Sequence, residues 1–481
     1  MVDCQLAPLV PYAPSTESPW DVNAVQHLHR RMGFEVGPDE IAVALSQNPV
    51  TYITNTLTAA AALAPMDEPV WGRYTISDYN DPSEVAENVI EWRTAWVNDM
   101  RDNPWRSKLV LFWHGHFVTG INKYQCPSWM WQYHDVLQRD AFGDFRALVR
   151  ATGKTPAMLV YLDGVLSSRF DANENFAREL FELFTLGEGN GYTQTDITEA
   201  ARAFTGYNGY TEACAPITFI PATFDPGSKT IFGQTGAYDF DAAVNLVFSE
   251  RAAECSRYIC GKLYAHYVSA QVDADVVEQL ATTFRDSDWS IVAVLEQLIT
   301  SEHFFSPALR GTRVKNPFEY VLGTEQLLAS TALRTPELTN AVAFVAGNMG
   351  QILFDPPDVA GWPGDRSWIN GNTLSVRFEG AEQLAYLIYL DDREALATWA
   401  KALNPASEFN VTDVTRAIVD FVLPQGLPTP AEYEQAEIAM RGEVPSYYFD
   451  SGLWSLDFEY APEQVATLLV YLLRRPEYQL C

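Results

Sequence analysis

Basic residues are scarce in this chain. Lys and Arg total 32 of the 481 residues, against 62 Asp and Glu, so the formal net charge is −30. A surface this acidic repels phosphate backbones and anionic lipid. The charge therefore argues against nucleic acid and against a membrane surface as partners, and it is typical of a well-solvated envelope or salt-adapted protein.

Long apolar runs are also missing, although 47% of the residues are apolar. No stretch approaches the roughly 20 consecutive apolar residues that cross a bilayer, so we predict no transmembrane segment. Residues 1–11 contain neither a basic segment nor a long apolar segment, and they do not read as a signal peptide. A signal peptide removed upstream of this start would leave the same sequence.

Cysteines are few, and their spacing contains no CxxC pair and no zinc pattern. Cys255 and Cys260 fall in one predicted helix, residues 251–267, where five positions turn them roughly 140° apart and argue against a bond between them. Each could pair instead with Cys214 or with a cysteine at a chain end. We favour disulfides over six buried thiols, because such bonds would fasten the chain ends. The six cysteines are Cys4, Cys126, Cys214, Cys255, Cys260 and Cys481.

Common catalytic signatures are absent as well. The chain contains no GxSxG nucleophile elbow, no phosphate-binding loop, no GxGxxG dinucleotide fingerprint and no HExxH zinc motif. These absences remove the standard hydrolase, nucleotide-binding and zinc-protease signatures and leave the reaction class open.

Apolar residues recur at helical spacing over most of the chain. We predict an all-α, large multi-helix protein with two long irregular or short-hairpin insertions, at about residues 207–240 and 354–374. Long irregular segments in compact proteins are often functional. The predicted parts are an N-terminal arm (1–21), a main helical core (22–385) and a C-terminal helical region packed on that core (386–481). Predicted helices cover 22–32, 38–46, 83–97, 106–117, 129–142, 144–151, 156–163 and, with interruptions, 241–333.

The segment 173–187 predicts a helix with one apolar face and one densely charged face. Asp171 with Glu174 suggests a capping box that opens this helix. Asp196, with the Glu three positions further on, suggests a similar opening for the next helix, 197–205.

Six strings of residues occur in one order along the chain and closely resemble the bacterial DUF1800 family. Together they are highly specific, and the resemblance extends over roughly residues 22–480. It implies a predominantly α-helical, often exported bacterial protein that is frequently encoded beside a DUF1501 protein, and it supplies no activity. The strings are HLHRRMGF (27–34), LFWHGHF (111–117), AMLVYLDG (157–164), NENFARELFELFTLG (173–187), EAARAFTG (199–206) and FDPPDVAGWPG (354–364).

The resemblance also bears on location and partners. It implies a periplasmic, cell-surface or secreted protein, with a DUF1501-type protein or a second copy of the chain as its partner. Two positions depart from the family. The family tends to carry His where this chain has Asp140, and His-Asp where it has Phe224-Asp225. An activity that depended on either His would be missing here.

Two histidines and two glutamates form the candidate metal site, because ionisable side chains in apolar sequence are costly to bury unless they are paired or bind something. His114 and His116 diverge by roughly 200° in a helix, so only one faces a given site unless Gly115 breaks the helix. With Glu179 and Glu182 they make a donor set that suits Mn, Fe, Zn or Mg, and helical bundles build such carboxylate–His sites. The sequence thus predicts these four residues as candidate ligands of one divalent metal.

The same residues fit a structural interpretation. One His would cap or pack while the other makes hydrogen bonds in the core, and Arg178, Glu179, Glu182 and Arg202 would form a buried ion-pair network. The Glu-x-x-His signature of carboxylate metal sites in bundles is missing, which favours this interpretation. In the metal interpretation, Asp163, Arg178 and Arg202 would support the ligands.

Two functions follow from these alternatives. The favoured one is an exported or cell-envelope protein that acts as a structural or binding component through its irregular loops, around a buried His/Glu/Arg cluster. The alternative is a metal-dependent hydrolase or oxidoreductase, in which the metal acidifies a bound water or binds O₂. In either case we expect the two insertions to converge on one face near His114 and Glu179.

Overall fold

The computed structural model describes residues 6–210, 213–330, 334–423 and 425–481. The chain is predominantly α-helical, which confirms the predicted all-α class. No helix within these ranges is long and apolar enough to cross a membrane.

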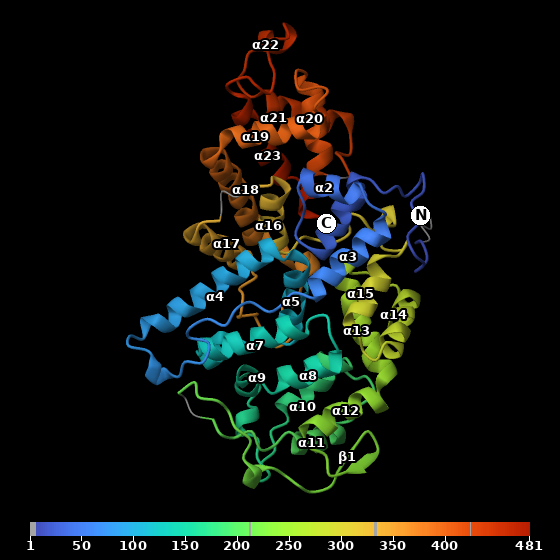
Figure 1. Cartoon of the computed structure of the whole chain (residues 1–481), viewed down its shortest axis with the longest axis vertical. Helices are drawn as coiled ribbons and strands as arrows, with labels where there is room; N and C mark the ends of the chain where they lie inside the picture. The colour runs from blue at the N-terminus through green and yellow to red at the C-terminus, as the bar shows by residue number, and fades with distance from the viewer. Residues whose placement is uncertain (1–5, 211–212, 331–333, 424) are drawn as a thin grey trace.

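Figure 1 shows a molecule that is longer than it is wide, with the C-terminal helices at its upper end and a small hairpin near its lower end. The lower half holds α6 (Ile121–Tyr124), α7 (Pro127–Asp140), α8 (Phe145–Gly153), α9 (Pro156–Tyr161), α10 (Asn175–Glu179), a π-helical turn (Leu180–Thr185), α11 (Gln194–Ala203) and α12 (Phe240–Glu250). The middle holds α1 (Val22–Met32), α2 (Pro38–Leu45), α3 (Pro49–Ala61), α4 (Ser83–Asp102), α5 (Pro104–His116), α13 (Ala252–Tyr267), α14 (Ala274–Asp286), α15 (Ile291–Ile299), α16 (Pro317–Leu327) and α17 (Pro336–Asn348). The upper end holds α18 (Gly371–Asp391), α19 (Arg393–Leu403), α20 (Val411–Val422), α21 (Pro430–Arg441), α22 (Ser446–Asp450) and α23 (Ala461–Leu473).

Both predicted insertions are irregular. The first contains the antiparallel hairpin of β1 (Lys229–Ile231) and β2 (Gln234–Gly236). The second contains one 3₁₀ turn, Asp365–Trp368, directly before α18. The remaining short 3₁₀ turns of the described residues are Ile76–Asp78, Gly164–Leu166, Pro221–Thr223, Pro307–Leu309 and Pro476–Gln479.

The starts of two helices differ from the sequence-based predictions. α10 begins at Asn175, directly after Glu174, and has no capping box. α11 begins about one turn earlier than predicted, because Asp196 is the last member of a capping box with Thr193 and not the first residue of the cap. Two acidic residues near a helix start thus gave the right element and the wrong boundary.

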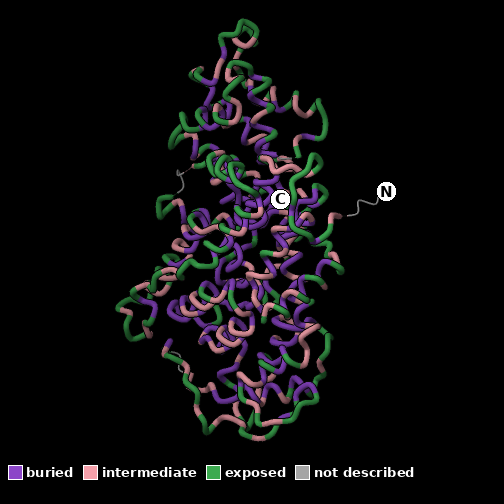
Figure 2. The backbone as a smooth tube through the Cα atoms, turned by 45° about the vertical axis from the view of Figure 1, so that its right-hand side comes forward, coloured by how far each residue is buried: buried purple, intermediate pink, exposed green. Residues whose placement is uncertain are grey.

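Buried residues run through the interior along the length of the molecule (Figure 2). A hydrophobic cluster includes side chains from Leu9 to Tyr478, so both ends of the chain join it. In the N-terminal arm, the Tyr12 N–H donates to the Thr300 carbonyl (2.7 Å), and its ring stacks on Phe305 with centroids 4.3 Å apart. The division into arm, core and C-terminal region stays a prediction; residue 385 lies inside α18, which packs against α23.

A disulfide joins Cys126 and Cys214 across 88 positions of sequence. The expectation that Cys255 and Cys260 pair with distant cysteines was wrong, because both thiols are free and fully buried inside α13. Their failure to pair with each other was predicted correctly. Cys481 is also free and buried, whereas Cys4 lies outside the described residues.

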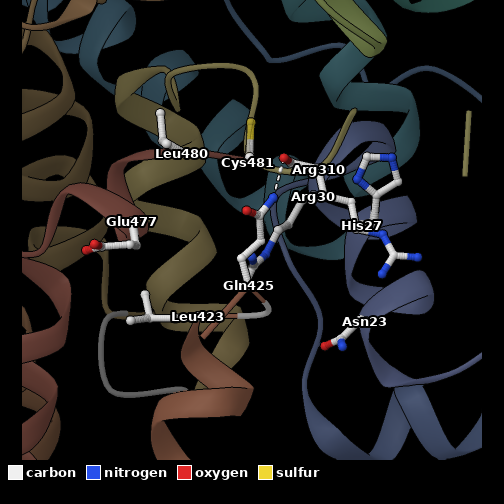
Figure 3. A pocket seen from close by; sticks show the side chains of 10 residues that line it. Asn23, His27, Arg30, Arg310, Leu423, Gln425, Glu477, Leu480 and Cys481 are labelled. Atoms are coloured by element: carbon white, nitrogen blue, oxygen red, sulfur yellow. Dashed lines mark hydrogen bonds between the residues drawn. The ribbon is translucent and has the colours of Figure 1, made fainter. Parts of the chain in front are cut away.

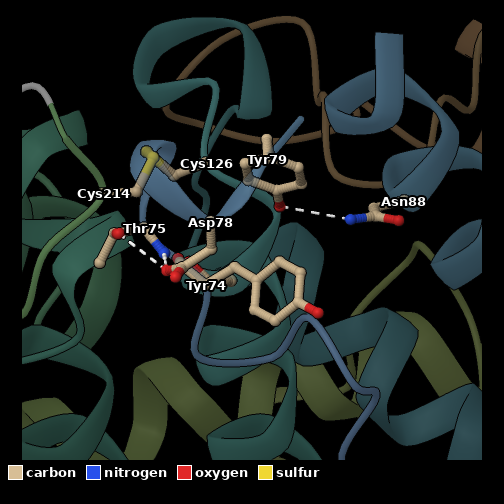
Figure 4. The surroundings of a disulfide bond; sticks show 8 residues. Tyr74, Thr75, Asp78, Tyr79, Asn88, Cys126 and Cys214 are labelled. Atoms are coloured by element: carbon tan, nitrogen blue, oxygen red, sulfur yellow. Dashed lines mark hydrogen bonds between the residues drawn. A yellow bond between two sulfur atoms is a disulfide. The ribbon is translucent and has the colours of Figure 1, made fainter. Parts of the chain in front are cut away.

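The disulfide fastens the first insertion to the residue before α7 (Figure 4). Beside it, the Ile76 N–H donates to the Ala213 carbonyl (2.9 Å), so the insertion is also bound to the segment before α4. Thr75 and Asp78 form a capping box in that segment. The insertion is thus held to the helical body at a defined point.

We expect the double variant Cys126→Ser/Cys214→Ser to lose about 2–4 kcal/mol of unfolding free energy, because the bond limits the unfolded chain over a long loop. Denaturant unfolding followed by circular dichroism measures this loss. Dithiothreitol should bring the parent protein to the stability of the double variant and leave the variant unchanged. A parent protein insensitive to the reductant would contradict the bond.

Candidate functional site

The His-Gly-His motif lies at the carboxyl end of α5, which runs without a break through Gly115 to His116. The break that Gly115 would permit, and that both histidines would need to face one site, is therefore not present. Because two positions turn a helix by roughly 200°, the two imidazoles face different neighbours.

His114 is fully buried and links three segments of the chain. Its Nε2 accepts from the Phe354 N–H (2.9 Å), so the proton is on Nδ1, which donates to the Tyr133 hydroxyl (3.0 Å). The Tyr133 hydroxyl in turn donates to the Phe117 carbonyl (2.6 Å). Burial lowers the pKa of His114 to about 3, so the ring is neutral. This relay ties α5 and α7 to the start of the second insertion.

His116 has the opposite tautomer. Its Nε2 donates to the Phe184 carbonyl (3.0 Å), and its Nδ1 accepts from the amine of Lys262 (3.1 Å). Phe184 lies in the π-helical turn that ends the charged helix of residues 173–187, where backbone carbonyls lack partners within the helix. Burial and the charge of Lys262 hold the pKa of His116 well below its usual range. His116 therefore joins α5, α13 and the end of the charged helix.

A close backbone approach explains Gly115. A Cβ on Gly361 would lie 2.1 Å from the Gly115 carbonyl oxygen, and Gly361 has φ +85°, a conformation that favours glycine. A Cβ on Gly115 would lie 3.2 Å from the Trp362 ring. The His-Gly-His motif and the second insertion are thus two sides of one contact.

A cavity of about 310 Å³ lies beside this contact. Its walls come from α5, α13, the second insertion and the segment before α16, which meet from distant parts of the sequence. Aromatic rings and basic side chains predominate, and Asp365 is the one acidic residue among those that line it. The lining includes Phe112, Gly115, His116, Lys262, His266, Arg313, Asn316, Trp362, Asp365 and Trp368.

Hydrogen-bond donors exceed acceptors around this cavity. Buried nitrogens of His266 (Nε2), Arg313 (Nη1) and Trp362 (Nε1) have no hydrogen-bond partner among the described residues. Guanidinium and indole N–H groups can only donate. Asp365 already accepts from the backbone N–H of Val314 (3.1 Å). With Lys262 and Arg313 against one carboxylate, the lining favours a ligand that carries anionic oxygens.

The charge of Arg313 is anchored from behind by Glu319. Glu319 is fully buried and pairs with Lys108 (2.5 Å) and Arg313 (3.4 Å). Burial opposes ionisation of this carboxyl, but the two cations hold its pKa well below the usual range. The ion pair uses Nη2 of the guanidinium, and Nη1 has no hydrogen-bond partner among the described residues.

The acidic helix lies outside this cavity. Arg178 pairs with Glu174 (3.1 Å) and Glu182 (3.3 Å), whereas Glu179 is half-buried and its pKa is raised by burial and by the Glu182 charge. Arg202 forms a separate group with Glu199 and Asp225. The structure thus divides the expected four-residue network in two, and neither group is fully buried.

Asp163 lies in yet another group, with Lys123 (3.3 Å) and the Asn175 amide (3.1 Å). Asp140, where the family tends to carry His, pairs with Arg139 (3.1 Å). Both carboxylates therefore have structural partners away from the His-Gly-His motif.

The structure does not bring the four candidate metal ligands together as one donor set. Both ring nitrogens of His114 and of His116 make hydrogen bonds, so neither ring has a lone pair left for a metal in this arrangement. Glu182 pairs with Arg178. Across the described parts of the chain, no group of three or more His, Cys, Asp or Glu side chains could hold a metal ion. A metal at these residues stays a prediction of the sequence.

Two other cavities lie elsewhere in the molecule. One of about 70 Å³ is lined by His27, Arg30 and Gln425, and the Gln425 amide donates to the Arg310 carbonyl (Figure 3). This volume holds only two or three waters. Another of about 490 Å³ lies near α16, and its charges include the Arg101–Glu325 pair (3.0 Å).

Sequence reasoning missed Lys262, His266 and Arg313. Lys262 and His266 are four positions apart on α13 and therefore share a helix face, which was a readable signal. Arg313 lies in an irregular segment before α16, and no local pattern connects it with α5. Their meeting with the His-Gly-His motif is a property of the tertiary fold.

A family model described as a protein of unknown function, DUF1800, matches residues 27–480. The chain therefore belongs to the DUF1800 family, as its motifs predicted. No curated protein and no solved structure matches it.

We expect Gly361→Ala to cost at least about 2 kcal/mol of unfolding free energy, because the new Cβ combines positive-φ strain with a clash on Gly115. Gly233→Ala is the matched control: its φ is +82°, but no heavy atom lies within 4 Å of a Cβ there. It should cost only about 1 kcal/mol, from strain alone. Equal losses in denaturant unfolding would contradict the close approach.

Burial lowers the pKa of the Lys262 amine to about 8. Below this pH the group is a charged ammonium, and above it the neutral amine predominates, so acylation should rise steeply near pH 8. Acetic anhydride labelling at several pH values, read by peptide mass spectrometry, measures the profile. The exposed Lys123 serves as the internal control for decay of the reagent. Labelling of Lys262 that rises only well above pH 8 would contradict the effect of burial.

Proposed function

We propose that this protein is an exported binding component whose cavity between α5, α13 and the second insertion takes a small anionic ligand with carboxylate or phosphate oxygens. The observation that carries this proposal is the basic lining of the cavity, where Lys262 and Arg313 face a single carboxylate, that of Asp365. Hydrogen bonds from charged donors to anionic oxygens are the strongest that proteins make to small ligands.

The walls of the cavity support binding of a compact ligand. Phe112 packs against His266 with ring centroids 5.0 Å apart, and Trp362 packs edge-on against His114 at 5.3 Å. Because these rings are held by the core, they give the cavity a fixed shape. A volume of about 310 Å³ is at the lower end for ligand pockets, which fits a metabolite-sized anion.

An extracytoplasmic location fits the bonding of the cysteines. The Cys126–Cys214 disulfide is of the kind that persists in oxidising compartments and is rare in the cytosol. Export also agrees with the tendency of the family. A DUF1501-type partner, or self-association of the chain, stays a prediction.

Isothermal titration calorimetry with malonate and with inorganic phosphate tests the proposal. We expect both anions to bind, and more weakly as salt is added, because ions screen the attraction. Lys262→Met removes one charged donor at the cavity and should weaken binding roughly tenfold. Lys123→Met removes an exposed lysine elsewhere and should leave binding unchanged.

The contradicting outcomes are distinct. If neither anion binds to the parent protein, the cavity is not an anion site. If Lys262→Met and Lys123→Met bind alike, the anion lies elsewhere on the molecule. Circular dichroism of both variants confirms that each is folded as the parent is.

A further inference from the structure

We propose that Lys262 holds its ligand covalently, by forming an imine with the carbonyl carbon of a small aldehyde or ketone that also carries a carboxylate or phosphate. The inference rests on the proposed function for the anionic group of this ligand. It adds the second functional group and names the residue that reacts with it.

Lys262 differs in its surroundings from the other lysines of the chain. Lys108, Lys123, Lys154 and Lys401 all pair with carboxylates. Lys229 donates to two backbone carbonyls, and Lys315 is buried over the Tyr478 ring. The contacts of Lys262 within the described residues are His116 and the Tyr258 ring, whose centroid lies 5.2 Å from Nζ. An amine without a carboxylate partner thus lines a cavity of metabolite size.

His116 holds this amine in a reactive arrangement. Because Nε2 of His116 carries the proton and donates to Phe184, its Nδ1 can only accept. An amine that donates one N–H to Nδ1 keeps its own lone pair free to attack a carbonyl. The Tyr258 hydroxyl donates to the Leu183 carbonyl (3.0 Å), which fixes the ring beside the amine.

The partners of the amine support this chemistry. A lysine amine is a nucleophile only when it is neutral, and Lys262 donates to a neutral imidazole with no carboxylate partner among the described residues to hold it as an ammonium. Lysines in partly apolar pockets are the usual carriers of imine chemistry for this reason.

The reaction balances without a further reagent. The nitrogen lone pair of Lys262 attacks the carbonyl carbon, and the electron pair of the C=O bond moves to oxygen. The nitrogen then loses its remaining protons, oxygen takes up two, and water leaves as the C=N bond forms. Arg313 and His266 lie in the same cavity, where they would bind the carboxylate or phosphate of the ligand during these steps.

Reductive trapping tests the inference. Glyoxylate, an aldehyde that carries a carboxylate, is incubated with the protein and sodium cyanoborohydride at mildly basic pH, and peptides are read by mass spectrometry. We expect carboxymethylation of Lys262 at least about tenfold faster than of Lys123. Glycolaldehyde has the same reactive group without the carboxylate and should lose most of this preference.

Lys262→Arg is the matched variant, because it keeps the positive charge and removes the reactive amine. It should form no adduct at position 262 under conditions in which the parent is labelled there. His116→Leu should slow trapping by removing the acceptor Nδ1, and His116→Gln, which restores an acceptor, should recover part of the rate.

The outcomes separate the two proposals. Malonate binding without preferential labelling of Lys262 would overturn the imine and leave the anion site standing. Neither binding nor labelling would overturn both. Preferential labelling that glycolaldehyde reproduces fully would show a reactive lysine without anion recognition, and this would overturn the inference as stated.

Discussion

The approach of Gly115 to Gly361 is the constraint on which the candidate site depends. A helix end and an irregular loop, almost 250 positions apart in sequence, meet where any side chain on Gly361 would overlap the Gly115 carbonyl. This contact places the Phe354 N–H on His114 and places Trp362 beside the cavity. The hydrogen bond from the Phe354 N–H to His114 helps to hold the loop in this position, and because it is buried away from water it is strong. The cavity is what remains between the fastened loop, α5 and α13.

The two histidines show that buried side chains with structural hydrogen bonds can give the same sequence pattern as metal ligands. An imidazole in the core must have both nitrogens satisfied or it destabilises the fold. His114 does so with a backbone donor and a tyrosine hydroxyl acceptor, and His116 with a helix-end carbonyl and the Lys262 amine. Opposite tautomers on neighbouring positions of one helix follow directly from these partners. Burial and the glycine contact therefore account for the pattern His-Gly-His in apolar sequence, and a metal at these residues stays a prediction.

Sequence reasoning found most elements of the fold and little of the site. Helical periodicity placed α1, α5 and α7, and the Gly- and Pro-rich stretches marked both insertions. α3 was missed, because its threonines lower helix propensity and it is held by tertiary packing of residues such as Ile53 and Leu57. The family resemblance correctly predicted that the chain belongs to DUF1800, but it gave no information on the reaction or ligand. The cavity could not be predicted, since Arg313 and Lys262 approach α5 only after the chain has folded, and disulfide pairing likewise depends on distances that spacing does not encode.

A donor-rich cavity in a protein of net charge −30 has consequences for what can reach it. At physiological ionic strength the acidic exterior acts over a Debye length of about 8 Å. A large polyanion such as nucleic acid meets many of these charges at once and is repelled before it contacts the cavity. A single carboxylate or phosphate meets far less repulsion and, under the proposed function, would exchange water for Lys262 and Arg313 inside the cavity, where each contact is stronger than in water. Under that proposal, the acidic surface would exclude polyanions and the basic cavity would admit small anions, so the two charge distributions would act together and not in conflict.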